Sequence, residues 1–245
     1  MEIGPLLGSG RTADVYALDG TWVLRRYRHG IDTTGELAVM SYLAASGFPV
    51  PRIGPPADDA LPTDLVVQRL TGPTLAEALL AGTVTEDEGA DLLARLLREL
   101  HAIPARLSQD PEDRVLHMDL HPENVILSPG GASVIDWPTA REGPPALDRA
   151  MTSLILAQVS LDPAFTAGAR LRDLLAALLT RFEADGGVPA DALARATALR
   201  AEDPRLTVQG TAALDEAADL VASLSGAGRL TSAGRPARRG PRGCP

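Results

Sequence analysis

A short segment in the middle of the chain contains polar residues whose types and spacing suit phosphate chemistry. Residues 115–137 read VLHMDLHPENVILSPGGASVIDW, in which His117-x-Asp119 is followed by Asn124 and then by Asp136. One carboxylate can orient an attacking hydroxyl or accept its proton. An amide oxygen and a second carboxylate can hold magnesium against a triphosphate. The segment therefore predicts a phosphoryl-transfer site.

The surroundings of these residues strengthen that interpretation. Val125–Leu127 and Ser133–Ile135 are expected to be short strands joined by a turn at 129–131, so Asp136 follows at the distance of a hairpin. The alternative is purely structural. Asp and Asn are common turn residues, and Asp is a common helix cap, so Asp119, Asn124 and Asp136 could serve the backbone alone.

HMDLHPENVIL followed by VIDW resembles the motif of aminoglycoside phosphotransferases and of the related choline and fructosamine kinases. The resemblance implies a two-lobed protein-kinase-like fold of the α+β class, with ATP and magnesium as cofactors. It implies that Asp119 is the catalytic aspartate and that Asn124 and Asp136 are magnesium ligands. His117 is expected to brace the loop, and Asp148 to brace the loop or lie at a helix N-terminus.

The first part of the chain matches nucleotide-binding elements of the same family. Gly8, Ser9 and Gly10 resemble a glycine loop whose backbone N–H groups approach phosphate oxygens. Arg25 stands where kinases carry a phosphate-binding lysine, and the chain contains no lysine. Arginine keeps its charge and can bind phosphate with two donors. The alternatives are an ordinary turn for the glycines and a surface place on an edge strand for Arg25.

Three more residues follow from the resemblance. Glu36 matches the glutamate that pairs with the phosphate-binding cation, although with Thr33 it would also complete a capping box. One carboxylate cannot make both interactions well, and we favour the ion pair. Gln68 and Leu70 match the hinge that holds adenine through backbone hydrogen bonds.

The order of predicted elements agrees with two lobes and a tail. Residues 1–70 read as strands with one helix and are expected to form an N-terminal nucleotide-binding lobe. Residues 71–225 are mostly helical, with two capping boxes and breaks at 162–163, 186–187 and 203–204, and are expected to form a C-terminal catalytic and substrate lobe. Residues 226–245 read as a disordered basic tail.

Composition restricts the partners. The net charge is −9, but the last twenty residues hold five arginines and no acid, so the body has 18 arginines against 32 acids. This acidic body disfavours nucleic acid and favours cationic partners, unless it reflects composition alone. The single cysteine, Cys244, excludes an internal disulfide. Without a membrane-spanning run or signal peptide, we expect a cytoplasmic protein.

We therefore predict an ATP-dependent kinase that phosphorylates a hydroxyl of a small molecule, with the acceptor and the oligomeric state left open. Two alternatives remain. A protein kinase is disfavoured because only about ten residues separate Asp136 from the next helical run, and no Ala-Pro-Glu element follows. A catalytically silent nucleotide-binding regulatory module would explain Arg25, and Ala13 in place of the third loop glycine.

Overall fold

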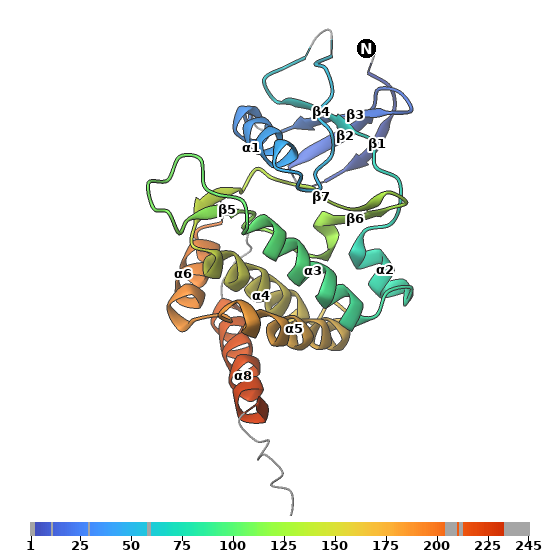
Figure 1. The fold of residues 1–245 in the computed structure, drawn as a ribbon. Helices are drawn as coiled ribbons and strands as arrows, with labels where there is room; N and C mark the ends of the chain where they lie inside the picture. The colour runs from blue at the N-terminus through green and yellow to red at the C-terminus, as the bar shows by residue number, and fades with distance from the viewer. Residues whose placement is uncertain are drawn as a thin grey trace, which may run out of the picture.

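The chain folds into a small lobe built on a sheet and a larger helical lobe beneath it (Figure 1). The computed structural model describes residues 3–10, 12–28, 30–57, 60–203, 210 and 213–232, the last six of these without their side chains. An N-terminal β-rich part followed by a helical part is the predicted α+β arrangement, which is confirmed.

The small lobe is a four-stranded antiparallel sheet in the order β1-β2-β3-β4. The strands are β1 (Leu6–Ser9), β2 (Ala13–Ala17), β3 (Trp22–Tyr27) and β4 (Asp64–Gln68). Strands β2 and β3 form a hairpin, and the Asp19 carboxylate holds its turn by accepting from the amides of Thr21 and Trp22 at 2.6 and 2.8 Å. In β3, alternate residues face opposite sides of the sheet, which separates the side chains of Arg25 and Arg26.

Helix α1 (Thr34–Ala45) packs against this sheet and begins differently from the prediction. The capping box of Thr33 and Glu36 does not form. The Thr33 side chain makes no cap and donates instead to the carbonyls of Pro62 and Asp64 at 3.2 Å. Asp32 accepts from the Thr34 amide at 2.6 Å in its place. Glu36 is thereby left for contacts with other elements.

The large lobe contains most of the helices. They are α2 (Leu75–Ala81), α3 (Glu86–Leu100), α4 (Pro145–Leu161), α5 (Gly168–Phe182), α6 (Ala190–Ala201) and α8 (Leu214–Ser232), with short 3-10 turns η1 (Pro122–Asn124) and η2 (Glu183–Asp185). Two small antiparallel pairs join β5 (Arg114–Leu116) to β8 (Arg141–Gly143), and β6 (Val125–Ser128) to β7 (Gly131–Val134).

Local signals in the sequence fix several of these boundaries. Both predicted capping boxes of the large lobe form, at Thr74 with Glu77 and at Thr85 with Glu88, and they start α2 and α3. Helices α4 and α6 end just before the predicted breaks, and α5 with η2 ends at Gly186, whose φ is 90°. The start of the predicted tail at 226 differs, because residues 226–232 continue α8, and 233–245 lie outside the described residues.

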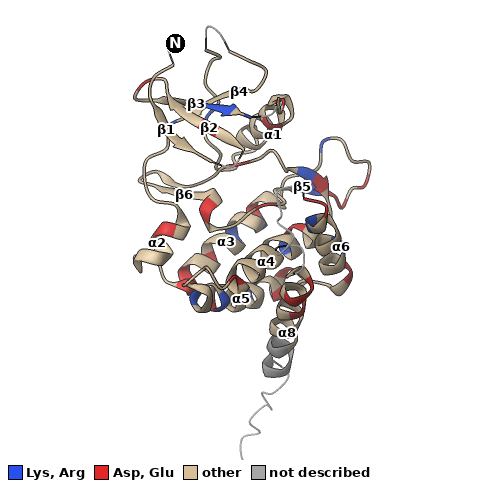
Figure 2. Ribbon diagram, turned by 180° about the vertical axis from the view of Figure 1, so that it is seen from behind, with Lys and Arg blue, Asp and Glu red and all other residues tan. Residues whose placement is uncertain are grey.

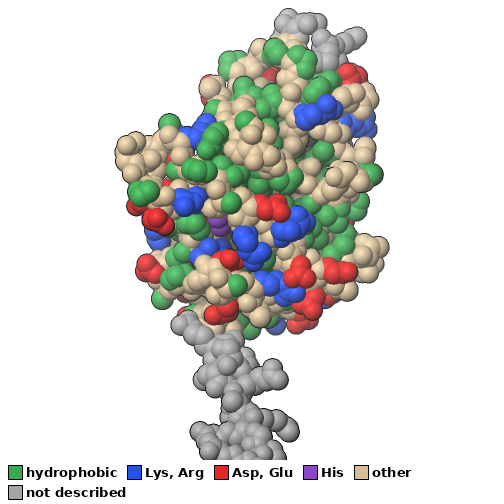
Figure 3. All heavy atoms as spheres, viewed as in Figure 1, with side chains coloured by type: hydrophobic (Ala, Val, Ile, Leu, Met, Phe, Trp, Pro, Cys, Tyr) green, Lys and Arg blue, Asp and Glu red, His purple; other side chains and the backbone are tan. Residues whose placement is uncertain are grey.

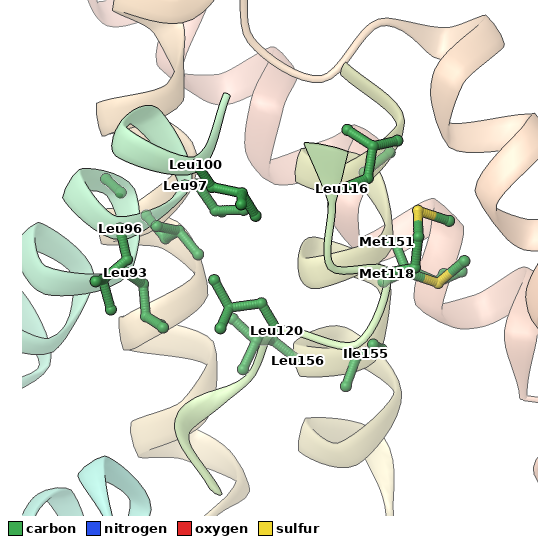
Figure 4. Packing of buried hydrophobic residues seen from close by; sticks show 14 of the residues in the cluster. Leu93, Leu96, Leu97, Leu100, Leu116, Met118, Leu120, Met151, Ile155 and Leu156 are labelled. Atoms are coloured by element: carbon green, nitrogen blue, oxygen red, sulfur yellow. The ribbon is translucent and has the colours of Figure 1, made fainter. Parts of the chain in front are cut away.

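The main core lies in the large lobe and holds the segment around Asp119 from one side (Figure 4). Leu116, Met118 and Leu120 are buried between the leucines of α3 and the apolar side chains of α4. The side chain of His117, between them in sequence, contacts the Trp137 ring and the Ile135 carbonyl instead. The core thus positions the site without supplying its polar groups.

Charged side chains of the large lobe pair across helices. Arg98 of α3 contacts Asp185 of η2 at 3.1 Å, and Arg181 of α5 contacts Asp91 of α3 at 2.5 Å. On the face shown in Figure 3, acidic and basic side chains accordingly lie next to one another over the helical half. No helix in the described part of the chain is long and apolar enough to cross a membrane.

We predict that Leu120→Ala lowers the free energy of unfolding by about 2–5 kcal/mol, because Leu120 is fully buried where the loop of Asp119 meets the core. Leu107→Ala, at a leucine that is 78% exposed, is the matched control and should change stability by less than about 0.5 kcal/mol. Urea unfolding of both variants measures the difference. Equal effects would contradict the proposed anchoring.

Candidate active site

The predicted site residues meet in a cleft between the lobes, with a volume of about 800 Å³. Its upper wall includes the β1–β2 connection, β3 and α1, and its lower wall includes the loop before η1, η1 itself and residues 135–136 after β7. Asp119, Asn124 and Asp136 all line this one cavity, as do Arg25 and Glu36. The structure thus brings together side chains that lie more than a hundred positions apart.

Asp148, at the N-terminus of α4, shapes the loop that carries Asp119. Its fully buried carboxylate accepts from the amides of His117 and Met118 at 2.9 and 2.8 Å, and from His101 Nε2 at 3.0 Å. Met118 has a φ of 64°, a left-handed conformation that is uncommon for a residue with a side chain. The two hydrogen bonds that the backbone amides donate to Asp148 hold this conformation in place.

Burial alone would raise the pKa of Asp148, but the hydrogen bond and charge of His101, with the amide of His117, outweigh it and hold the pKa below its usual value. Asp148 therefore stays ionised. Its position agrees with the bracing role expected from the sequence.

His117 joins the loop to the strand that precedes Asp136. Its Nε2 lies 3.0 Å from the Ile135 carbonyl, and its ring packs on Trp137 with centroids 4.4 Å apart. Its own carbonyl accepts from the Thr139 hydroxyl at 3.0 Å. With no exposed surface, this side chain links the backbone around Asp119 to that around Asp136.

Asn124 joins the backbone of Asp119 to the backbone that precedes Asp136. Its Nδ2 donates to the Asp119 carbonyl at 2.8 Å, and its own carbonyl accepts from the Ile135 amide at 3.0 Å. Asp136 follows with a φ of 70°, which turns the chain out of the strand direction at the cleft. The side-chain nitrogen of Asn124 is thereby engaged inside the loop, while its side-chain oxygen, Oδ1, can serve as a ligand.

Arg25 connects the two lobes. One end of its guanidinium contacts Asp136 Oδ1 at 2.5 Å, and the other contacts Glu36 Oε1 at 3.4 Å. Figure 2 shows the basic segment of β3 next to α1. The ion pair that we favoured for Glu36 is present, and the contact with Asp136 is an additional one that the sequence did not indicate.

Glu36 is buried and contacts three partners. Besides Arg25 it accepts from the Tyr27 hydroxyl at 2.6 Å and from the Trp137 amide at 3.1 Å. Burial raises the pKa of Glu36, against the opposing effects of Arg25, Tyr27 and the Trp137 amide. These partners come from β3 and from the segment after β7, so a single carboxylate joins three elements.

The residues expected to hold the nucleotide differ in whether they line the cleft and in which of their polar groups already have hydrogen-bond partners. Ser9, Gly10, Gln68 and Leu70 line the cleft, whereas Gly8 does not. The backbone N–H of Gln68 donates to the Arg52 carbonyl at 2.8 Å and is therefore engaged. The hinge contact predicted for Gln68 is compatible with this structure only through its backbone carbonyl. Ser9 Oγ donates to Asp14 Oδ1 at 2.6 Å, which fixes the loop from outside the cleft.

A second cavity, of about 340 Å³, opens on the other side of Asp119. Asp119, His121 and Glu123 line both cavities, so the two spaces meet at these residues. Arg200 of α6 lies at this junction, with Nη1 3.5 Å from Asp119 Oδ1. No sequence signal indicated this second cavity, because most of its lining comes from α2, α4, α5 and α6, whose Ala/Leu-rich sequences indicate only helix.

His121 lies where the two cavities meet. Burial is the main cause that lowers its pKa, so the ring is neutral near pH 7. Its Nε2 lies 3.2 Å from Asn124 Nδ2. A neutral ring at this position adds no positive charge beside Asp119.

The side chains of the large cleft fit a magnesium ion in their donor chemistry. Asp136 and Asn124 offer the hard oxygen ligands that magnesium prefers. In the described residues no three His, Cys, Asp or Glu side chains form a group that could hold a metal ion. An ion here would therefore depend on the amide oxygen and on phosphate oxygens of a bound nucleotide.

Comparison with known proteins agrees with this geometry. The model of the phosphotransferase enzyme family matches the chain over residues 4–114 and 54–181. No curated protein matches.

Solved structures with the same arrangement include ADP-bound aminoglycoside phosphotransferase APH(2'')-Ib, with 13% identity over 92% of this chain and 94% of that chain and a TM-score of 0.57. The streptomycin–ATP complex of APH(2'')-IIa has 15% identity over 90% and 93% and a TM-score of 0.58. Choline kinase LicA from Streptococcus pneumoniae has 14% identity over 96% and 94% and a TM-score of 0.52. The predicted two-lobed kinase-like fold is confirmed.

We predict that Asp148→Asn lowers the free energy of unfolding at pH 7 by about 2–3 kcal/mol, because the buried amides of His117 and Met118 lose a charged acceptor. The folded-state pKa of Asp148 lies below its value of 3.8 in the absence of interactions. Its stabilisation is therefore present above that pH and is lost as the pH falls through the folded-state pKa.

Urea unfolding from pH 7 down to about pH 3 measures this difference between the wild type and Asp148→Asn, which should shrink below about pH 4. Asp173→Asn, at an exposed position of α5, is the control. A difference that grew on acidification would contradict the assignment.

Proposed function

Since this chain belongs to the phosphotransferase enzyme family, we propose that it transfers the γ-phosphate of ATP to a hydroxyl group of a small molecule. The observation that carries the proposal is the position of Asp119 between two cavities that share it. The larger cavity has the size for a nucleoside triphosphate and is lined by Arg25, Asn124 and Asp136, and the smaller one is a separate space for an acceptor. A carboxylate between them is where a hydroxyl must be oriented.

In this proposal Asp119 acts on the acceptor. Its carboxylate accepts a hydrogen bond from the acceptor hydroxyl and takes its proton as the hydroxyl oxygen bonds to the γ-phosphorus. The bond from that phosphorus to the oxygen bridging the β- and γ-phosphates breaks, and ADP leaves with the electron pair. Asp148 and His117 act indirectly, because they hold the backbone that positions Asp119.

Other residues hold the nucleotide. Arg25 would bind phosphate oxygens with its guanidinium, kept in place by Glu36. Leu70 and Gln68 would bind adenine through backbone groups, and Ser9 and Gly10 would cover the phosphates. Asn124 and Asp136 would hold magnesium, which when bound neutralises charge on the triphosphate. Asp136 must then exchange its contact with Arg25 for the ion.

We expect ATP to raise the melting temperature only when magnesium is present, because phosphate binding near Asp136 without the ion brings like charges together. Asp136→Asn should abolish most of that magnesium-dependent shift. Asp110→Asn, on the loop before β5 and outside both cavities, is the control. Differential scanning fluorimetry with ATP, with and without magnesium, measures the effect.

The same measurement separates the proposal from its alternative. Asp136 is already ion-paired with Arg25. The alternative is therefore a chain that binds a nucleotide without catalysis. Nucleotide binding that is independent of magnesium, together with no release of ADP in the presence of any acceptor, would favour this silent regulatory module over the enzyme.

We expect Asp119→Ala to lower the rate of ADP release by roughly 10²–10⁴-fold with any accepted hydroxyl compound, since a general base contributes that much. A coupled ADP-release screen of hydroxyl-bearing metabolites and antibiotics identifies the acceptor on the wild type first. ATP binding should persist in the variant. An unchanged rate would remove Asp119 from the mechanism.

A further inference from the structure

We propose that the acceptor is a compact alcohol with a mainly apolar body and no ammonium group beside its reacting hydroxyl, rather than a polycationic aminoglycoside. This inference rests on the proposed function, because it assigns the smaller cavity to the acceptor. It goes further by stating which chemistry that cavity recognises. The observations are the apolar lining, the arginines among its charged residues, and its volume.

The walls of the smaller cavity are mostly hydrophobic. Two of the lining side chains, Leu80 of α2 and Val159 of α4, are 54% and 39% exposed. Large apolar side chains left open to solvent beside a cavity are typical of ligand sites, because a bound molecule removes them from water. The other apolar lining residues are Ala76, Leu79, Pro122, Ile155, Leu156, Phe165, Ala167, Leu171 and Leu174.

The charged groups of this cavity are largely matched within the protein. Arg170 contacts Glu86 at 2.5 Å, and Arg200 contacts Asp203 at 3.3 Å and Asp119 at 3.5 Å. Three of the four acidic lining residues thus already have an arginine partner. An acceptor with several ammonium groups would have to compete with these arginines for each carboxylate.

Arg200 also selects at the reacting hydroxyl. Its guanidinium lies beside the carboxylate that orients the acceptor, so an ammonium on the neighbouring carbon would be placed near a like charge. Like-charge repulsion is one way in which a site discriminates between ligands. Amino alcohols are therefore disfavoured, although the described lining holds four acidic side chains against two arginines, because an ammonium here must displace Arg200 from Asp119 or Asp203. This proposal therefore departs from the cationic substrate that the net charge favoured.

The volume sets an upper limit on size. At about 340 Å³ the cavity is near the lower end of the roughly 300–1,000 Å³ range of ligand pockets. A compact aryl or alkyl alcohol can place its body against α4 and α5 while its hydroxyl reaches Asp119. A large polyhydroxylated sugar would leave the apolar walls in contact with polar groups.

Titration calorimetry on the full chain without nucleotide tests the proposal with phenylpentanol, with its analogue that carries an amino group beside the hydroxyl carbon, and with kanamycin. We expect phenylpentanol to bind at least about tenfold more tightly than either amine. Kanamycin or the amino alcohol binding as tightly, or no binding of phenylpentanol, would overturn the proposal.

Two pairs of variants locate the binding. Val159→Asp should weaken phenylpentanol binding about tenfold by placing a charge on an apolar wall, whereas Leu107→Asp, at an exposed leucine outside the cavity, should not. Arg200→Gln should reduce the discrimination against the amino alcohol, and Arg200→Lys should keep it. Equal effects of Val159→Asp and Leu107→Asp would mean that phenylpentanol binds elsewhere.

ATP-induced thermal stabilisation, measured on the same samples with magnesium, separates this proposal from the proposed function. A chain that is stabilised by ATP with magnesium and prefers kanamycin keeps the phosphotransferase function and loses this acceptor class. A chain that ATP does not stabilise under any condition loses the proposed function itself, whatever its preference among the alcohols.

Discussion

The arrangement of the cleft depends on one buried carboxylate, that of Glu36. A charge removed from water must be compensated by hydrogen bonds and opposite charges, and Glu36 obtains them from Arg25, Tyr27 and the Trp137 amide. These partners belong to the sheet of the small lobe and to the segment that carries Asp136. Because leaving any of them unpaired costs free energy, the requirement of one side chain fixes how the two lobes face each other.

Arg25 also joins the two lobes, and its geometry differs from that of the lysine expected at this position in a kinase. A planar guanidinium has donors at both ends, so it reaches Glu36 and Asp136 together, whereas an ammonium is a compact point charge. The consequence is a cleft in which a candidate metal ligand is already ion-paired. Nucleotide and magnesium binding would have to redistribute these contacts, which makes Arg25 the group whose position reports the occupied state.

Two kinds of interaction hold the loop of Asp119, apolar burial on one side and hydrogen bonds to a buried carboxylate on the other. Leu116, Met118 and Leu120 anchor it in the core by apolar burial, while Asp148 fixes its backbone by charged hydrogen bonds. Apolar burial is not directional, and hydrogen bonds to a buried carboxylate are. Together they hold a left-handed residue next to Asp119 and place that carboxylate where the two cavities meet.

The sequence alone determined the order of elements, two capping boxes of the large lobe, the helix breaks, and the positions of Asp119, Asn124 and Asp136, because these signals are local in type and spacing. It could not decide whether Glu36 capped its helix or paired with Arg25, nor reveal that Arg25 also reaches Asp136. Nor could it place Arg200 beside Asp119 or show that α4 and α5 line an apolar cavity. Those outcomes depend on which residues distant in the chain compete for one buried carboxylate or share one wall, and only the packed tertiary structure sets these contacts.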